Sequence, residues 1–441
     1  MDLDVVIHNG TLLTVDRRLR IIPSGWIGIG DGRIRAVEAL SADNPPPTAP
    51  LVIDAAGGIV MPGLVNTHTH LPMTLFRGLA DDLPLDAWLN DHIFPAEARF
   101  IDPRTVHWGT LLACAEMLLS GTTCCCGGYF HEAAVAGAVE QTGMRAVLAQ
   151  GVIDAPAPGV PDPARNIAHA DRYARAWRGR SPLITPSIFC HAPYTCGDGT
   201  LRAGKALADD LGLLFQVHAA ETRAEREQSL KGKKHSPVAH LDRLGLLDPH
   251  TLLAHCVWVD DDDIAVMART GCAVAHCPES NMKLAAGIAP VPSMRKAGIP
   301  VGLGTDGCAS NNDLNLFGEM GTAAKLHKVA SGDPTTLDAA SVLRMATVEG
   351  ARAIGLGDQI GSLEVGKQAD IIVIDAHRPH LTPLYHPDSH MVYAAGGGDV
   401  CHVLVAGRPL VRDRRLLTID IDAVMDRVTR IAGDIRRHGG G

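Results

Sequence analysis

The chain has 441 residues, of which 46% are hydrophobic and 20% are charged, as in an ordinary globular protein with a large core. Its formal net charge of −9 argues against a surface that binds nucleic acid, which would be basic. The N-terminus lacks the basic and apolar segments of a signal peptide, and no run of 18 apolar residues occurs, so we expect a cytoplasmic protein with neither nucleic acid nor membrane as a partner.

The first 58 residues predict a small β module. Apolar, β-branched segments at 5–10, 11–16 and 25–30 are separated by Gly, Asp and Asn turn signals. Residues 41–50 are rich in proline, which indicates a loop.

From residue 59 the pattern changes to apolar runs that alternate with helical stretches such as 105–120. The candidate strands are 58–65, 122–126, 146–152, 183–189, 213–217, 251–254, 272–275 and 301–304. Eight strands that alternate with helices predict an α/β fold with a parallel, TIM-like (β/α)8 barrel over residues 59–359. The near-continuous apolar character of these strands fits burial on both faces.

After the barrel, the sequence predicts a return to the N-terminal β module. A polar, Gly-marked connection at 360–370 precedes strands expected at 371–374 and 403–411. We therefore predict a smaller, discontinuous β-sandwich domain built from residues 1–58 and 360–441. Within it, Asp420 is a suitable N-cap for a surface helix that continues to about Arg437.

Active sites of (β/α)8 barrels lie at the C-terminal ends of the strands, so polar residues that follow each predicted strand are candidates for chemistry. His68 and His70 follow the first strand at a spacing that points both imidazoles to one face. The later strand ends carry His191, His218, His255, His276 and Asp306. Any one of these could be structural, but their accumulation at one rim predicts a metal-dependent active site.

Three imidazoles and one carboxylate can hold a divalent ion and leave a position for water. We expect this shell to consist of His68, His70, His218 and Asp306. Such an ion lowers the pKa of bound water to about 7 and generates hydroxide at neutral pH. His255 and Asp306 are placed to take the water's proton or hold the hydroxide, and Glu221 could pass a proton to a ring nitrogen or leaving group. Strand four ends in His191 rather than a lysine that could bridge two ions, which favours one metal ion.

With these motifs the chain resembles members of the amidohydrolase superfamily. The motifs that carry this resemblance are PGLVNTHTH at 62–70, HAAET at 218–222, AHC at 254–256 and GTDG at 304–307. A closer resemblance is to the 5′-methylthioadenosine/S-adenosylhomocysteine deaminases. It rests on MTLFRG at 73–78, DLPLDAWL at 82–89, PAE at 95–97, HAPY at 191–194, ESNMKL at 279–284 and GCASNN at 307–312.

The resemblance implies a zinc enzyme, with one zinc ion per subunit, that deaminates an adenine nucleoside at C6 by hydrolysis. Glu97 matches the carboxylate that holds the ribose hydroxyls, His191 matches a histidine that contacts the substrate, and Trp88 would be an apolar wall. Because relatives often form homo-oligomers, a homo-oligomer is also expected.

Two departures from the family pattern bear on the substrate. Where members that act on S-adenosylhomocysteine carry an arginine near the end of strand three, this chain has Gln150. Loss of a cation weakens binding of the charged homocysteine tail more than of a neutral methylthio group. We therefore favour 5′-methylthioadenosine, with S-adenosylhomocysteine and adenosine as further candidates. Gly127 and Gly128 replace an Asp-Met pair, which could alter the shape of the pocket.

Two alternatives remain open from the sequence. The first is a deaminase or hydrolase of another aminated heterocycle, such as guanine, 8-oxoguanine or a triazine. Glu97 discriminates against it, because a bare base has no ribose diol for this carboxylate to hold. The second is a barrel that has lost catalysis and serves as an assembly subunit, against which the complete set of strand-end residues argues.

Overall fold

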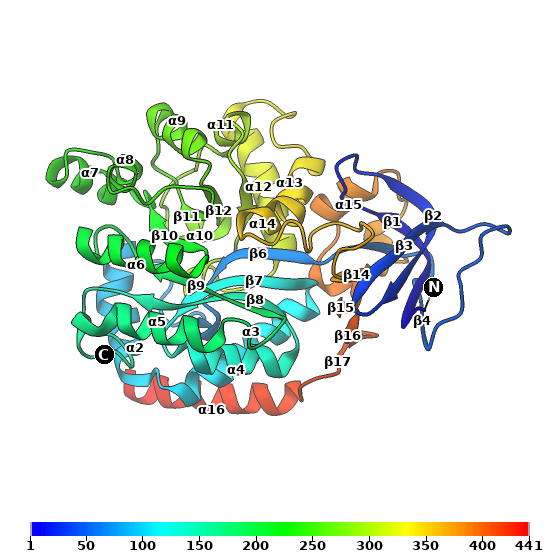
Figure 1. Ribbon diagram of the computed structural model, residues 1–441, viewed down its shortest axis with the longest axis horizontal. Helices are drawn as coiled ribbons and strands as arrows, with labels where there is room; N and C mark the ends of the chain where they lie inside the picture. Colours follow the sequence, from blue (N-terminus) through cyan, green and yellow to red (C-terminus); the bar gives the residue numbers. More distant parts are fainter. Residues whose placement is uncertain (1, 440–441) are drawn as a thin grey trace.

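The computed structural model describes residues 2–439, in which two β-sheets organise the chain (Figure 1). Eight parallel strands, each paired with the next along the chain, build the predicted (β/α)8 barrel. They are β6 (Leu64–Thr69), β7 (Thr122–Tyr129), β8 (Arg145–Val152), β9 (Ile184–Cys190), β10 (Phe215–Ala219), β11 (Thr251–His255), β12 (Ala273–His276) and β13 (Val301–Leu303). Each overlaps a segment predicted from the sequence.

The barrel closes where its last strand meets its first. The Asp306 N–H donates to the His68 carbonyl oxygen over 2.9 Å, and Thr67 Oγ1 donates to the Leu303 carbonyl oxygen over 2.9 Å. Gly302 permits this approach, because a Cβ there would lie 2.3 Å from Thr67 Cγ2. The seam therefore places the residues that follow β13 beside those that end β6.

Helices cover the outside of the barrel (Figure 1). They are α3 (Pro103–Leu119), α4 (Glu132–Thr142), α5 (Asn166–Trp177), α6 (Asp198–Leu211), α7 (Arg223–Gly232), α8 (Pro237–Arg243), α9 (Asp261–Thr270), α10 (Pro278–Lys283), α11 (Val291–Lys296), α12 (Leu316–Ser331), α13 (Ala339–Met345) and α14 (Val348–Ala353). Local capping supports them: Asp102 accepts a hydrogen bond from the Thr105 N–H at the start of α3, as an N-cap does.

Between β6 and α3 the chain makes an excursion of short helices. These are η1 (Leu71–Phe76), α1 (Leu85–Ala87), the π-helical η2 (Trp88–Ile93) and α2 (Phe94–Phe100). π-Helical turns are rare and often occur at functional sites, and this one contributes Trp88 and Leu89 to the pocket described below.

Strands from both ends of the chain form a second, nine-stranded sheet, as predicted. They are β1 (Val5–Leu13), β2 (Ile21–Gly30), β3 (Arg33–Ala39), β4 (Leu51–Asp54), β5 (Ile59–Pro62), β14 (Ile371–Ile374), β15 (Val400–Val405), β16 (Arg408–Arg412) and β17 (Arg415–Leu416). The sheet encloses an apolar core of its own, which includes Ile7, Ile29 and Leu404. Three further segments, η4 (Pro379–Leu381), α15 (Pro387–Tyr393) and η5 (Gly397–Asp399), lie between β14 and β15.

The structure differs from the prediction at the junction of the two sheets. The apolar run predicted as one strand at 58–65 divides at Gly63: β5 pairs with β1 and β14, and β6 begins the barrel. A Cβ at Gly63 would lie 2.1 Å from Thr123 Oγ1, so the chain crosses close to β7 at this point. An unbroken apolar run carries no sign that it changes sheets.

Smaller differences concern the sheet from the two chain ends. The segments 5–10 and 11–16 form the single strand β1, the segment 403–411 contains parts of β15 and β16, and β3 and β4 were not predicted. The C-terminal helix is present as α16 (Ile421–Gly439). Asp420 accepts a hydrogen bond from the Ala423 N–H over 3.1 Å, which confirms its N-cap role.

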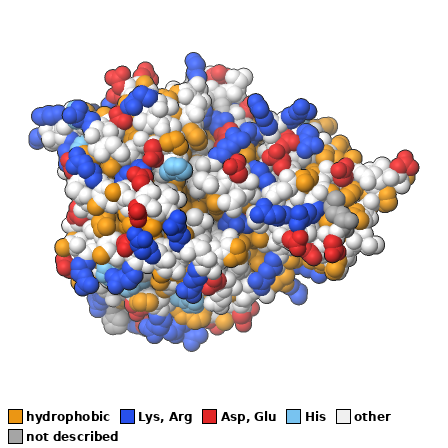
Figure 2. Space-filling model, in the orientation of Figure 1, with side chains coloured by type: hydrophobic (Ala, Val, Ile, Leu, Met, Phe, Trp, Pro, Cys, Tyr) orange, Lys and Arg blue, Asp and Glu red, His pale blue; other side chains and the backbone are white. Residues whose placement is uncertain are grey.

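The surface in view carries both signs of charge. Figure 2 shows acidic and basic side chains interspersed over this face of the molecule. Within residues 2–439, every helix falls short of the length and apolar character that a membrane crossing requires.

Candidate active site

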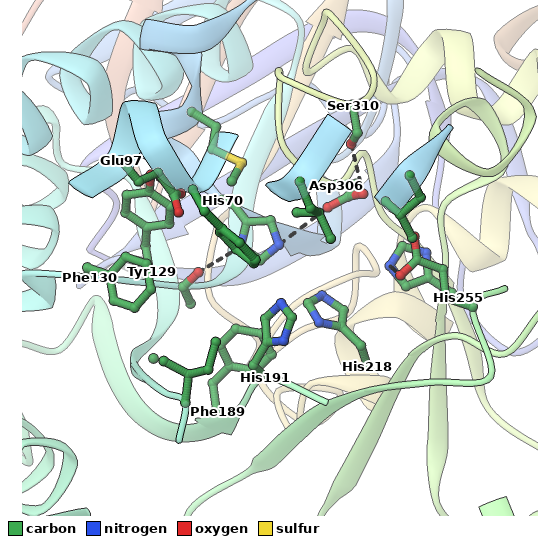
Figure 3. Close-up of a pocket in the computed structure, with 18 of the residues that line it drawn as sticks. His70, Glu97, Tyr129, Phe130, Phe189, His191, His218, His255, Asp306 and Ser310 are labelled. Atoms are coloured by element: carbon green, nitrogen blue, oxygen red, sulfur yellow. Dashed lines mark hydrogen bonds and ion pairs between the residues drawn. The ribbon is translucent and has the colours of Figure 1, made fainter. Parts of the chain in front are cut away.

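Five of the strand-end residues predicted from the sequence converge at the C-terminal mouth of the barrel (Figure 3), namely His68, His70, His218, His255 and Asp306. His68 Nε2 lies 3.1 Å from His218 Nε2. Asp306 Oδ1 lies 3.5 Å from His68 Nε2 and 3.4 Å from His70 Nε2. His255 joins this cluster, since its ligand atom and those of His68 and His218 all lie within 4.8 Å of one another. All five side chains are buried.

Hydrogen bonds orient two of the imidazoles toward the centre of the cluster. His70 Nδ1 lies 2.7 Å from the Gly128 carbonyl oxygen, and His255 Nδ1 lies 3.0 Å from Asn281 Oδ1. A carbonyl oxygen only accepts, so each Nδ1 carries the proton and donates it. The Nε2 lone pair of each ring is then free to bind a metal ion, as is usual where an outer partner fixes the tautomer.

The two oxygens of the Asp306 carboxylate have different partners. Its Oδ2 accepts hydrogen bonds from Ser280 Oγ (2.8 Å) and Ser310 Oγ (2.9 Å), while Oδ1 faces the histidines. The backbone of Asp306 has a φ of 60° and that of His255 a φ of 72°, both in the left-handed region that such residues seldom adopt. Strained backbone of this kind is common where a fold positions functional side chains.

The electrostatics of the cluster suit a divalent cation. Burial lowers the pKa of His68 to about 4 and that of His218 well below its usual value. Burial alone would raise the pKa of Asp306, but the neighbouring His68 and His255 imidazoles hold it well below its usual range. Neutral imidazoles and an ionised carboxylate are the protonation states that metal ligands need, so these residues fit a divalent metal ion.

Glu221 stands beside this cluster, in the segment that follows β10. Its Oε2 lies 3.9 Å from His255 Nε2. Burial raises the pKa of the Glu221 carboxyl, although the His255 imidazole opposes the rise. A carboxyl group with a raised pKa in this position can both receive and return a proton.

Glu225 supports the backbone at Glu221, which the sequence reasoning missed. Its Oε1 accepts from the Ala220 N–H (3.0 Å) and its Oε2 from the Glu221 N–H (2.8 Å). No role was predicted for this buried carboxylate. At the start of α7, Thr222 Oγ1 accepts a hydrogen bond from the Glu225 N–H over 3.1 Å. A Thr three residues before a Glu is the sequence signature of a capping box, and this pattern could have revealed that the glutamate turns back toward the helix start.

A pocket opens above the cluster. Glu97, His191 and Trp88, which the sequence placed at the substrate, all line it. Glu97 is buried and accepts a hydrogen bond from the Tyr129 hydroxyl over 2.5 Å, while His191 Nδ1 lies 2.8 Å from Thr195 Oγ1. The remaining wall is largely apolar, with Leu85, Leu89, Phe94, Phe130, Val152, Ile153 and Phe189. Among the described residues that line this pocket there is no lysine or arginine.

Two residues at predicted strand ends lie elsewhere. Gln150 accepts a hydrogen bond from the Glu132 N–H over 3.2 Å and borders a separate hollow beside α5. Successive residues of a strand face opposite sides, so Gln150 shares its side of β8 with Leu148, a buried residue of the main hydrophobic core. Gln150, which the sequence placed at the substrate, therefore lies outside the pocket. His276 also turns away and lies 3.2 Å from His327, measured between their Nε2 atoms.

The glycine pair at 127–128 leaves room for an aromatic ring. A Cβ at Gly128 would lie 2.4 Å from Phe189 Cδ1, so Phe189 fills the space that a side chain there would take. The centroid of the Phe189 ring lies 5.1 Å from that of His218 and 6.0 Å from that of His70. The departure from the family pattern therefore gives the floor of the pocket an aromatic surface.

Comparisons with known proteins identify the family of the chain. A model of the amidohydrolase family matches residues 59–410. The chain is 48% identical, over 98% of both chains, to a 5-methylthioadenosine/S-adenosylhomocysteine deaminase from Syntrophobacter fumaroxidans. It is 44% identical, again over 98% of both, to a 5′-deoxyadenosine deaminase from Methanosarcina mazei. The structure of an adenosine deaminase from Xanthomonas campestris with bound zinc superposes with a TM-score of 0.96 at 40% identity and covers 99% of each chain. As its motifs predicted, the chain belongs to the amidohydrolase family, among its hydrolytic deaminases.

Proposed function

We propose that this protein is a zinc-dependent deaminase that hydrolyses the C6–amino bond of an adenine nucleoside, with 5′-methylthioadenosine as its preferred substrate. One observation carries the proposal: a single pocket contains both the cluster suited to a metal ion and the buried carboxylate of Glu97. The relatives named above act on adenine nucleosides, as their names state.

The residues proposed to hold one zinc ion per subunit are His68, His70, His218 and Asp306. A zinc ion in such a site supplies a water molecule of lowered pKa at neutral pH. The water oxygen bonds to C6 while Glu221 donates a proton to the adjacent ring nitrogen. Asp306 and His255 take up the proton that the water loses and return it to the amino group. The C6–nitrogen bond then breaks while the C6 hydroxyl gives its proton back to Glu221, so that ammonia leaves, the inosine analogue remains and Glu221 is protonated again.

The apolar wall supports a neutral group at the 5′ position. Phe130, Val152 and Ile153 line the pocket, and its described lining offers no cation to pair with an amino-acid carboxylate. Burying that carboxylate without a partner would cost several kcal/mol, roughly the penalty of desolvating an unpaired ion. A methylthio or methyl group has no such cost. The apolar lining of the pocket, and not Gln150, therefore disfavours the charged homocysteine tail.

The substrate is tested by ammonia release and loss of adenine absorbance. The panel contains 5′-methylthioadenosine, 5′-deoxyadenosine, adenosine, S-adenosylhomocysteine, guanine and 8-oxoguanine. We expect kcat/KM for 5′-methylthioadenosine to exceed that for S-adenosylhomocysteine by at least about 10-fold, the equivalent of about 1.4 kcal/mol. Turnover of free bases alone would contradict the nucleoside assignment and favour a heterocycle deaminase instead.

Glu97 gives the ribose selectivity a predicted pH dependence. Burial raises its pKa to about 7, although the hydrogen bond from Tyr129 lowers it. The ionised carboxylate accepts from both ribose hydroxyls, whereas protonation removes part of that acceptor capacity. We define the diol ratio as kcat/KM for adenosine divided by kcat/KM for 2′,3′-dideoxyadenosine, in which titrations common to both substrates cancel.

The diol ratio is expected to rise as the pH increases from about 6 to about 8, because Glu97 ionises in this range. In Glu97→Gln the ratio should be lower and independent of pH, since the amide does not titrate. Steady-state kinetics with both nucleosides at each pH give the ratio. A diol ratio near one in the unaltered enzyme would remove Glu97 from ribose recognition.

A further inference from the structure

We propose that Tyr129 is a specificity-determining residue of this pocket, whose hydroxyl fixes the Glu97 carboxylate for a substrate with an intact ribose diol. This inference rests on the proposed function and adds a residue to it. Tyr129 ends β7 and lines the same pocket as Glu97. Figure 3 shows the two side chains together on one side of His70, away from His218 and His255.

The contact between the two residues is short and shielded from solvent. The Tyr129 hydroxyl donates to Glu97 Oε1 over 2.5 Å, in the range of charge-assisted O–H···O⁻ hydrogen bonds. Tyr129 is 5% exposed and Glu97 is 3% exposed. Among the described residues, Tyr129 is the one side chain that hydrogen-bonds the Glu97 carboxylate. The carboxylate plane is therefore set by Tyr129.

The two residues lie on different kinds of element, Glu97 on a short helix and Tyr129 on a strand of the barrel. Glu97 lies on the seven-residue helix α2, within the excursion of short helices between β6 and α3. Tyr129 lies on a barrel strand, next to Gly128, whose carbonyl oxygen accepts from His70 Nδ1. The ring centroids of Tyr129 and His70 are 6.4 Å apart. The hydroxyl therefore ties Glu97 to the strand that also orients a proposed zinc ligand, and so fixes the position of the ribose-binding carboxylate relative to the proposed zinc site.

This arrangement makes a specific demand on the ligand. Tyr129 occupies one lone pair of Oε1, which leaves Oε2 and the second lone pair of Oε1 for two donors. Two adjacent hydroxyls on one ribose supply two donors at a suitable separation. A substrate without them leaves the buried carboxylate with unfilled acceptor sites, and such a loss is more costly than the gain from one bond. We infer that the pocket rejects 2′,3′-dideoxynucleosides and that this rejection depends on the Tyr129 hydroxyl.

The test is Tyr129→Phe, which removes only the hydroxyl. The diol ratio defined above should fall about 10-fold, the worth of a hydrogen bond to a charged group, mainly through a higher KM for adenosine. The kcat/KM for 2′,3′-dideoxyadenosine should change by less than about 2-fold, since that substrate does not engage Glu97. Thermal melting of each variant shows whether the fold is kept.

Tyr173→Phe is the matched control. Tyr173 is also buried, but its hydroxyl has no hydrogen-bond partner among the described residues and it borders the hollow beside α5. Its loss should leave the diol ratio unchanged. In a Glu97→Gln background, Tyr129→Phe should also have no further effect on the ratio, because the hydroxyl acts through Glu97.

An equal loss of kcat/KM for both nucleosides in Tyr129→Phe would show that the hydroxyl only supports the pocket, and the inference would be wrong. An unchanged diol ratio would overturn it as well. These results differ from a failure of the proposed function, in which the unaltered enzyme would deaminate neither nucleoside or would show no preference for the diol.

Discussion

Replacing Glu221 with glutamine is expected to lower kcat by about 10²- to 10⁴-fold, the contribution of a well-placed proton donor and acceptor. KM and zinc content should stay close to those of the unaltered enzyme, because Glu221 is outside the four proposed ligands. Its Oε2 lies 3.9 Å from His255 Nε2. The amide keeps the size of the side chain but cannot give or take a proton. Steady-state assays with 5′-methylthioadenosine, together with metal analysis of the same samples, measure both quantities.

Glu227→Gln provides the matched control for this substitution. Glu227 lies on α7, six residues after Glu221, and its exposed side chain pairs with Arg223 over 2.8 Å. Its loss should change activity by less than about 2-fold, as for an ordinary surface substitution. If Glu221→Gln kept more than about a tenth of the activity, Glu221 would not be the proton carrier of this reaction. If the variant lost zinc instead, Glu221 would be a support of the metal cluster.

The cluster at the barrel mouth could be predicted because the positions of its side chains follow from strand geometry, which can be read from neighbouring residues in the sequence. A strand turns alternate side chains to one face, so His68 and His70 had to point together once the run before them was identified as a strand. Parallel strands end on the same side, which brought His218, His255 and Asp306 to the same rim. The structure places all five as expected.

The same rule of alternation shows why Gln150 was misplaced. Its position near the end of β8 suggested the pocket, but its side chain shares a strand face with the buried Leu148 and borders a separate hollow. The predicted start of the barrel at residue 59 differs from the structure for another reason, since β5 pairs with β14 and only β6 belongs to the barrel. The run from Ile59 to Val65 is apolar throughout, and nothing in its composition marks the passage from one sheet to the other at Gly63.

Contacts between distant segments were beyond reach of the sequence. Tyr129 and Glu97 are 32 residues apart and meet only after the excursion of short helices has folded over β7. Ser280 and Asp306 meet in the same way across the loops after β12 and β13. Such pairs depend on loop geometry, which no periodicity encodes. They are also the contacts that set the orientation and charge of the residues that were predicted.

Removal of the metal ion is expected to abolish deamination and to lower the melting temperature, with both restored by added zinc. His68 Nε2 and His218 Nε2 lie 3.1 Å apart, burial keeps both rings neutral by lowering the pKa of each, and removal of a zinc ion takes away the partner that both nitrogens would share. At least one buried nitrogen then lacks a favourable partner, and Asp306 Oδ1 is ionised beside it. An ion that binds only the folded chain would stabilise it by about 4 kcal/mol at a thousand times its dissociation constant.

Dialysis against a chelator, followed by assays and thermal scans with and without added zinc, measures this coupling. His218→Ala should lose the zinc-dependent rise in melting temperature, whereas His250→Ala, a change at an exposed histidine, should keep it. Full activity in protein shown by metal analysis to contain no ion would refute the metal-dependent reaction. A normal melting temperature in such protein would instead show that the cluster is stable without the ion. Catalysis and stability depend on the same side chains. Deaminase activity and melting temperature, each measured as zinc is added, should therefore give the same dissociation constant for zinc.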